Sequence, residues 1–203
     1  MNIDEIALEI VNICKYLRQS KLVNATHGNI SAKVNNDVML ITPTGSDFFT
    51  LKKEDLVQMN IKTGQILSDG RPSKEYDLHL LAYQKRPDIN AVIHAHSPNT
   101  VAISCLKDIK NLDSIVPAYT LSFAIYTKHL PMVDYFKAGS LELAQKATEK
   151  LSQGNAVVLK HHGIVVGAQN LLNALYRLEE IEENSNIALK IGLNHIALDP
   201  NAL

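Results

Sequence analysis

The chain has 203 residues, a length typical of one domain, and residues 1–203 are expected to form a single unit. Its 20 basic and 21 acidic side chains leave a net charge of −1, which argues against nucleic-acid binding because that needs a basic face. No apolar run is long enough to span a membrane. The acidic start differs from a signal peptide, and two cysteines are too few for a disulfide framework. These features predict a cytoplasmic protein with no membrane or nucleic-acid partner.

The first third of the chain predicts one helix followed by two hairpins. Asn2 is suited to cap the helix, and Glu5 stands at the capping-box position. Apolar residues recur every three or four positions along it: Ile3, Ile6, Ile10, Ile13 and Leu17. Each hairpin has a turn-forming tripeptide between two short strands, at 29–34 and 38–42, then at 57–61 and 65–67.

The rest of the chain alternates helices with short strands. A helix after Ser73 directs Leu78, Leu81 and Ala82 to the core and ends at Arg86-Pro87-Asp88, because proline disfavours helix before it. Further strands are expected at 91–96, 132–135, 156–160 and 164–166, and further helices at 99–106, at 141–151 and from Asn170. This mixture predicts an α/β domain with a mixed, mostly antiparallel central sheet covered by helices.

The eight histidines are the unusual feature of the composition, and two of them stand at the end of an apolar strand. His94 and His96 are two apart, so their side chains point to the same face of that strand. Two imidazoles on one face can bind one divalent metal ion. The alternative is a pair of polar strand-end residues that water satisfies.

Other residues can complete such a metal site. Either histidine of His161-His162-Gly163 can add a third imidazole, and Glu75 opens the helix just upstream. Three imidazoles and one carboxylate suit zinc or a similar divalent ion. His79 lies on the same helical face as Glu75 and is an alternative ligand, although its apolar neighbours favour a structural role.

Three segments combine glycine or a helix start with small polar side chains. Residues 26–31 and 42–46 can present backbone N–H groups to a phosphate, and the helix start at 72–75 adds Ser73 and Lys74. The alternatives are ordinary turns, with Ser73 only an N-cap. The sequence alone does not establish that the three segments meet.

Six motifs together resemble the class II aldolase/adducin family, in its order and approximate spacing, over nearly the whole chain. They are Gly28-Asn29-Ile30-Ser31, Ile41-Thr42-Pro43-Thr44-Gly45, Ser73-Lys74-Glu75, Arg86-Pro87-Asp88, His94-Ala95-His96-Ser97 and His161-His162-Gly163. Each motif alone is weak, whereas six in order are specific for the family and less so for the substrate. The resemblance is strongest to members that act on L-fuculose 1-phosphate, and it implies a three-layer fold.

The resemblance also implies a site. The implied zinc ligands are Glu75, His94, His96 and His162, with Glu75 also the catalytic acid/base. The implied phosphate contacts are Gly28, Asn29, Thr44, Gly45, Ser73 and Lys74. One Zn²⁺ per subunit is expected, with Mn²⁺ or Co²⁺ as alternatives. Related aldolases usually have serine at the position of Lys74, so this lysine either strengthens anion binding or marks a different subgroup.

The implied reaction is cleavage of a phosphorylated ketose to dihydroxyacetone phosphate and an aldehyde through a zinc-stabilised enediolate. The implied assembly is a homotetramer with active sites between subunits, to which a neighbour donates a tyrosine. Leu121 occupies that tyrosine's position, with Tyr119 and Tyr126 nearby. The alternatives are a methylthioribulose-1-phosphate dehydratase, a pentulose-5-phosphate 4-epimerase and a non-catalytic adducin-like module. Such modules tend to lose the metal ligands, which this chain retains.

Overall fold

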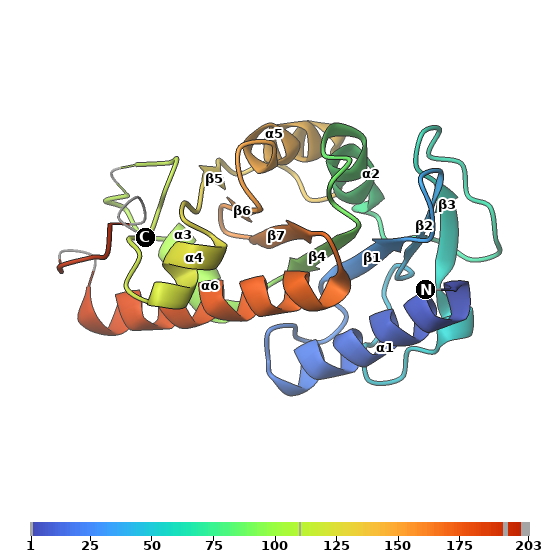
Figure 1. Ribbon diagram of the computed structural model, residues 1–203, viewed down its shortest axis with the longest axis horizontal. Coiled ribbons are helices and arrows are strands. Elements are labelled where there is room, and N and C mark those ends of the chain that lie inside the picture. The colour runs from blue at the N-terminus through green and yellow to red at the C-terminus, as the bar shows by residue number, and fades with distance from the viewer. Residues whose placement is uncertain (1, 110, 193–194, 200–203) are drawn as a thin grey trace.

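A central sheet runs through the computed structural model, which describes residues 2–109, 111–192 and 195–199 (Figure 1). Across these residues the sheet has seven strands in the order β3-β2-β1-β4-β7-β6-β5. Only β5 and β6 run parallel, and the other neighbours are antiparallel. The strands are β1 Asn29–Lys33, β2 Val38–Ile41, β3 Val57–Asn60, β4 Ala91–Ala95, β5 Met132–Val133, β6 Ala156–Leu159 and β7 Gly163–Ala168. The predicted mixed, mostly antiparallel sheet is confirmed.

Helices cover both faces of this sheet, which gives three layers (Figure 1). Helices α2 and α5 lie on one face, whereas α1, α3, α4 and α6 lie on the other. Their bounds are α1 Ile3–Gln19, α2 Tyr76–Lys85, α3 Pro98–Ser104, α4 Leu121–Tyr126, α5 Leu141–Leu151 and α6 Leu171–Ile191, with a 3₁₀ turn η1 at Lys53–Asp55. Among the described residues, no helix combines the length and apolar character needed to cross a membrane.

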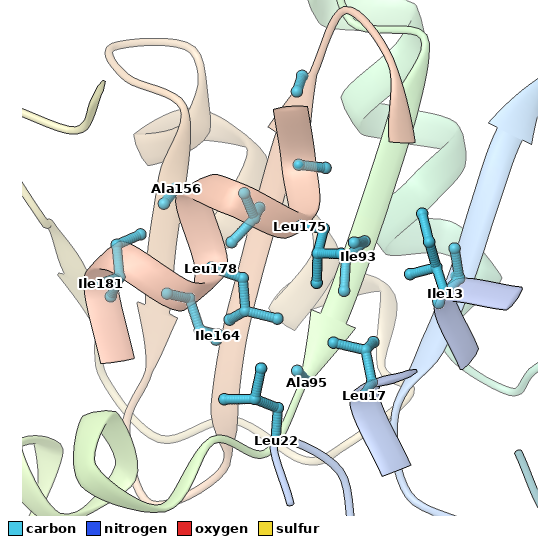
Figure 2. Close-up of a cluster of buried hydrophobic side chains, with 14 of the residues drawn as sticks. Ile13, Leu17, Leu22, Ile93, Ala95, Ala156, Ile164, Leu175, Leu178 and Ile181 are labelled. Atoms are coloured by element: carbon cyan, nitrogen blue, oxygen red, sulfur yellow. The ribbon is translucent and has the colours of Figure 1, made fainter. Parts of the chain in front are cut away.

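Helix α1 shows how local sequence signals set an element. The Asn2 side chain accepts a hydrogen bond from the Glu5 N–H at 2.9 Å, and the Glu5 carboxylate accepts one from the Asn2 N–H at 2.8 Å. The predicted capping box is therefore confirmed. The apolar stripe faces the sheet, where Ile13 and Leu17 join the core beside Ile93 (Figure 2).

Two expected strands are shorter than predicted, and two elements, helix α4 and the 3₁₀ turn η1, were not predicted. The expected strand at 65–67 is reduced to a bridge between Met59 and Ile66 flanked by two backbone hydrogen bonds, because the Gln58 N–H donates to the Ser68 hydroxyl instead of a backbone carbonyl. The expected strand at 132–135 has only two residues. Helix α4 was not predicted, because six residues are too few to show an apolar period.

Alternation along the strands separates an apolar core from a polar site. On β4, Ile93 and Ala95 join the core under α1 and α6 (Figure 2), whereas Val92 joins the core under α2 and α5. His94 shares the face of Val92 because side chains alternate along a strand. Its antiparallel partner on β1 is Asn29. Polar side chains of two neighbouring strands are thus directed toward the start of α2.

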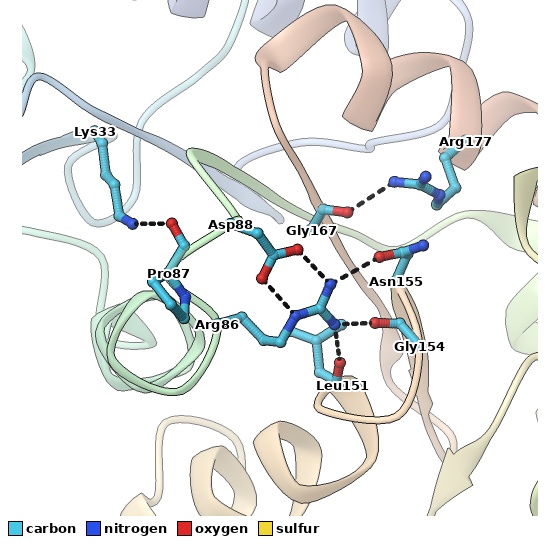
Figure 3. A network of polar contacts seen from close by, with 9 residues as sticks. All are labelled: Lys33, Arg86, Pro87, Asp88, Leu151, Gly154, Asn155, Gly167 and Arg177. Carbon is cyan, nitrogen blue, oxygen red and sulfur yellow. Dashed lines mark hydrogen bonds and ion pairs between the residues drawn. The ribbon is translucent and has the colours of Figure 1, made fainter.

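The Arg86-Pro87-Asp88 motif ties α2 to the turn between α5 and β6 (Figure 3). The Arg86 guanidinium binds both carboxylate oxygens of Asp88, at 2.8 and 2.7 Å. It also donates to the carbonyl oxygens of Leu151 and Gly154 and to the Asn155 side chain. Strand β6 starts at the end of this turn and leads to His161 and His162, so the motif supports the site from a distance.

We predict that Arg86→Met lowers the free energy of unfolding by about 2–3 kcal/mol, because carbonyl oxygens lose a charged donor. Chemical denaturation measures this. The control is Lys146→Ala on α5, which removes only an exposed ion pair with Glu149 and should change the free energy by less than about 1 kcal/mol. Equal losses in the two variants would contradict the structural role given to Arg86.

Candidate metal centre

The four side chains expected to ligate metal meet at one point, and their ligand atoms all lie within 4.8 Å of one another. His94 is near the end of β4 and His96 follows that strand. His162 lies in the turn between β6 and β7, and Glu75 is the N-cap of α2. Residues far apart in sequence therefore converge where the start of α2 reaches the end of β4.

The distances describe a compact donor set. The Nε2 atom of His94 is 3.3 Å from Glu75 Oε2 and 3.1 Å from His96 Nε2. The Nε2 atom of His162 is 3.4 Å from Glu75 Oε1, a buried atom with no hydrogen-bond partner in the described part of the chain. An orphaned carboxylate oxygen facing three imidazoles fits a divalent cation of the zinc type.

The electrostatics favour the deprotonated forms of Glu75, His96 and His162. Burial raises the pKa of Glu75, but the proximity of His94, with smaller contributions from His162 and the Asn29 hydrogen bond, outweighs it and holds that pKa well below its usual range. Burial lowers the pKa of His96 to about 3 and the pKa of His162 to about 4. Both imidazoles therefore stay neutral near pH 7, the form that metal ligation requires.

The orientation of His94 is set by the backbone. Its Nδ1 atom lies 3.0 Å from the carbonyl oxygen of Ile164, to which it donates a hydrogen bond. This bond assigns the other nitrogen, Nε2, to the cluster, as is usual for histidines that bind metals. Burial lowers the pKa of His94, but Glu75 outweighs it and raises that pKa, so a proton and a cation compete for Nε2.

The three glycine-containing or helix-start segments line one pocket of about 240 Å³ beside the cluster. It contains every residue expected to contact phosphate and three of the expected metal ligands: Gly28, Asn29, Thr44, Gly45, Ser73, Lys74, Glu75, His96 and His162. Gly28 has a positive φ of 85°, and a Cβ there would lie 2.9 Å from the carbonyl oxygen of His94. The segments therefore meet beside the donor set, and phosphate binding stays a prediction.

Two of these residues have additional partners. The Ser73 hydroxyl accepts a hydrogen bond from the Glu75 N–H at 3.2 Å, and the N-cap of α2 is Glu75 rather than Ser73. The Asn29 side chain donates to Glu75 Oε2 at 3.0 Å and contacts His79 Nε2 at 2.6 Å. The Asn29 side chain therefore holds the carboxylate directly.

Three further histidines lie near the donor set, and the sequence alone did not decide their roles. His79 is outside the donor cluster, since both of its ring nitrogens contact Asn29 and Ser31. His161 contacts the Cys105 sulfur at 3.2 Å and is outside the cluster too. The His27 ring lies 5.2 Å from the His96 ring and lines the pocket. The position of His27 inside the 26–31 segment was the signal for this role.

Comparison with known proteins identifies the family. The family model described as Class II Aldolase and Adducin N-terminal domain matches residues 8–189. The chain belongs to this class II aldolase/adducin family. Membership accounts for the six motifs and supports an enzyme that acts on a small sugar phosphate.

The relatives differ in the reactions for which they are named. The L-fuculose phosphate aldolase of Methanocaldococcus jannaschii is 34% identical over 181 residues, which cover 89% of this chain and 94% of that protein. The 3-oxo-tetronate 4-phosphate decarboxylase of Haemophilus influenzae is 32% identical over 160 residues, or 79% and 75% of the two chains. The structure of YgbL from Escherichia coli, a candidate aldolase, epimerase or decarboxylase, superposes with a TM-score of 0.92 at 27% identity, covering 99% and 98%. These relatives therefore share one family, and their named reactions differ.

We predict that Gly163→Ala weakens zinc binding about tenfold or more, an effect typical of residues that support metal ligands. A Cβ at Gly163 would overlap the Ala95 carbonyl oxygen and lie 3.1 Å from His94 and 3.2 Å from His96. Titration with zinc against a chelator measures the effect. Gly154→Ala is the matched control, because a Cβ there meets nothing within 4 Å. Unchanged zinc affinity in Gly163→Ala would contradict the close packing of this turn against the two histidines.

Proposed function

We propose that the protein is a zinc-dependent, cytoplasmic aldolase that cleaves a phosphorylated ketose of the L-fuculose 1-phosphate type. The products would be dihydroxyacetone phosphate and an aldehyde. The observation that supports this most is the pocket that Glu75, His96 and His162 line together with two glycine-containing loops. The 34% identity to an L-fuculose phosphate aldolase supports the same substrate class.

The ligands in this proposal are Glu75, His94, His96 and His162. Zinc held there would supply a Lewis acid for the substrate carbonyl. In the cleavage the C3–C4 bond breaks, the C4 hydroxyl loses a proton and C3 gains one. Glu75 is assigned the transfer to C3, because its Oε1 is buried beside the donor set and has no hydrogen-bond partner in the described residues.

The phosphate of the substrate would be held by local loops. Gly28 and Gly45 both have positive φ and border the pocket, and the start of α2 adds the Ser73 hydroxyl and the Lys74 side chain. Backbone N–H groups in such loops and at helix starts attract anions. Holding the substrate by its phosphate places the reacting carbon near Glu75, which can contribute several kcal/mol to catalysis.

The proposal includes a homotetramer with active sites between subunits. Helix α4 supports it, because Leu121 and Ile125 are each 54% exposed and Tyr126 is 51% exposed. Such an apolar surface is typical of an interface. The hydroxyl of Tyr119 donates to the Gly192 carbonyl oxygen within the chain, so Tyr126 is the better candidate for the tyrosine given to a neighbour.

We predict that Glu75→Gln keeps most of its zinc at saturating zinc, because three imidazoles still hold the ion. It loses turnover by at least about a hundredfold, because an amide cannot exchange the proton. Elemental analysis and a dihydroxyacetone phosphate assay with L-fuculose 1-phosphate measure the two effects. His94→Ala is the comparison variant and should lose the metal itself. Full activity of Glu75→Gln would remove the carboxylate from its catalytic role.

A second candidate is decarboxylation of a 3-oxo-tetronate 4-phosphate. It is favoured by the 32% identity to the Haemophilus influenzae decarboxylase. Loss of CO₂ from this β-keto acid would also leave dihydroxyacetone phosphate, so the same pocket suits both reactions. CO₂ release separates the decarboxylase from the aldolase. Methylthioribulose 1-phosphate and a pentulose 5-phosphate are tested as further substrates. Water loss from the first or epimerisation of the second would replace both the aldolase and the decarboxylase proposals.

We predict that Lys74→Ser raises KM for phosphorylated ketoses about tenfold, since a charge-assisted hydrogen bond to phosphate is lost. Lys74 is exposed and borders the pocket, so its replacement should leave the fold intact. Kinetics with L-fuculose 1-phosphate and 3-oxo-tetronate 4-phosphate test its role. A rise in KM confined to 3-oxo-tetronate 4-phosphate would instead mark Lys74 as the group that recognises the substrate of a decarboxylase.

A further inference from the structure

A line of buried hydrogen bonds leads from Glu75 into the layer between β1 and α2. Asn29 contacts Glu75 Oε2 at 3.0 Å, and Asn29 Oδ1 lies 2.6 Å from His79 Nε2. The Ser31 hydroxyl lies 2.7 Å from His79 Nδ1 and 2.7 Å from the Tyr83 hydroxyl. Ser31 and His79 are fully buried, and Asn29 and Tyr83 are each 3% exposed. Water therefore has little access to any of these bonds.

Each of these bonds has a defined direction. An ionised carboxylate only accepts hydrogen bonds, so the Asn29 NH₂ group faces Glu75 and the Asn29 carbonyl oxygen faces His79. That oxygen needs a donor, which places the His79 proton on Nε2. Burial keeps the ring neutral, so Nδ1 accepts from the Ser31 hydroxyl, and Ser31 in turn accepts from Tyr83. Every donor in the line points toward Glu75.

The sequence spacing explains how this line forms. Glu75, His79 and Tyr83 are four residues apart, so they share one face of the α2 segment. Asn29 and Ser31 are two apart on β1, so they share one face of that strand. The surrounding layer is apolar, and in such a setting an unsatisfied polar group would be destabilising. The line is fully paired, which is typical of polar networks that specify one geometry.

We propose that His79 is a positioning residue for Glu75. Through Asn29 it holds the carboxylate in the one orientation that presents Oε1 to the donor set. The effect on metal binding needs only the metal centre, whereas the effect on turnover rests on the proposed function. Tyr83 and Ser31 fix the tautomer of His79 from the other side.

Two substitutions at His79 separate positioning from packing. His79→Leu fills the space without a donor, and it should weaken zinc affinity about ten- to a hundredfold, as expected for loss of an outer hydrogen bond to a ligand. His79→Gln places an amide N–H near the former Nε2 atom and should restore affinity to within a few-fold of wild type. With an active substrate, His79→Leu should lower kcat more than it raises KM.

Leu80→Ala is the matched control, because Leu80 is buried on the same helix and takes no part in the line. It should lower Tm at least as much as His79→Leu and leave zinc affinity unchanged. Wild-type zinc affinity in His79→Leu would overturn the proposal. It would also be overturned if His79→Gln were as weak as His79→Leu, or if Leu80→Ala lost zinc equally.

Nitrogen-15 NMR of the wild-type protein tests the same proposal without any variant. The expected spectrum shows His79 as the neutral Nε2–H tautomer, and the Nδ1–H tautomer would overturn the directed line. Neither this measurement nor zinc titration uses a sugar phosphate. A negative aldolase assay would therefore remove the proposed function and leave the role of His79 standing.

Discussion

The site depends on one constraint, the close approach of the start of α2 to the turn between β6 and β7 across the end of β4. This approach brings the Glu75 carboxylate within 3.4 Å of two histidines that come from different strand ends. Gly163 lets this turn pack against β4, since a side chain there would collide with the Ala95 carbonyl oxygen. Without a bound cation, the negative charge of the carboxylate and the lone pairs of three imidazoles would lack a partner. The fold and the ion are therefore expected to stabilise each other.

The two faces of the sheet have different roles. The face under α1 and α6 is an apolar core that holds β4 and β7 in register (Figure 2). The face under α2 is largely apolar, and its polar positions include Asn29, Ser31 and Lys33 on β1 and His94 on β4. Those polar positions are paired with groups from α2. A chain of near-zero net charge can therefore build the local site that the proposed anion and cation require, without an excess of one charge on its surface.

Much of the fold could be predicted from local patterns, because caps and apolar periods are properties of short segments. The bounds of α5 and the capping box of α1 are examples. The strand order could not be read this way, since it depends on pairing between distant segments such as β1 and β4. The site shows the same division. His94 and His96 were found by their spacing, but sequence periodicity could not separate Glu75 from His79, which share one helical face. Only the position of β1 shows that His79 binds Asn29 and Ser31 instead.

X-ray absorption at the zinc edge of the purified, zinc-loaded protein tests the central claim most directly. The account predicts one tightly bound zinc per chain, with three imidazole nitrogens and at least one carboxylate oxygen around it. A thiolate in the coordination sphere, fewer than three imidazoles, or no stoichiometric zinc at all would contradict the metal centre on which the proposed aldol cleavage depends.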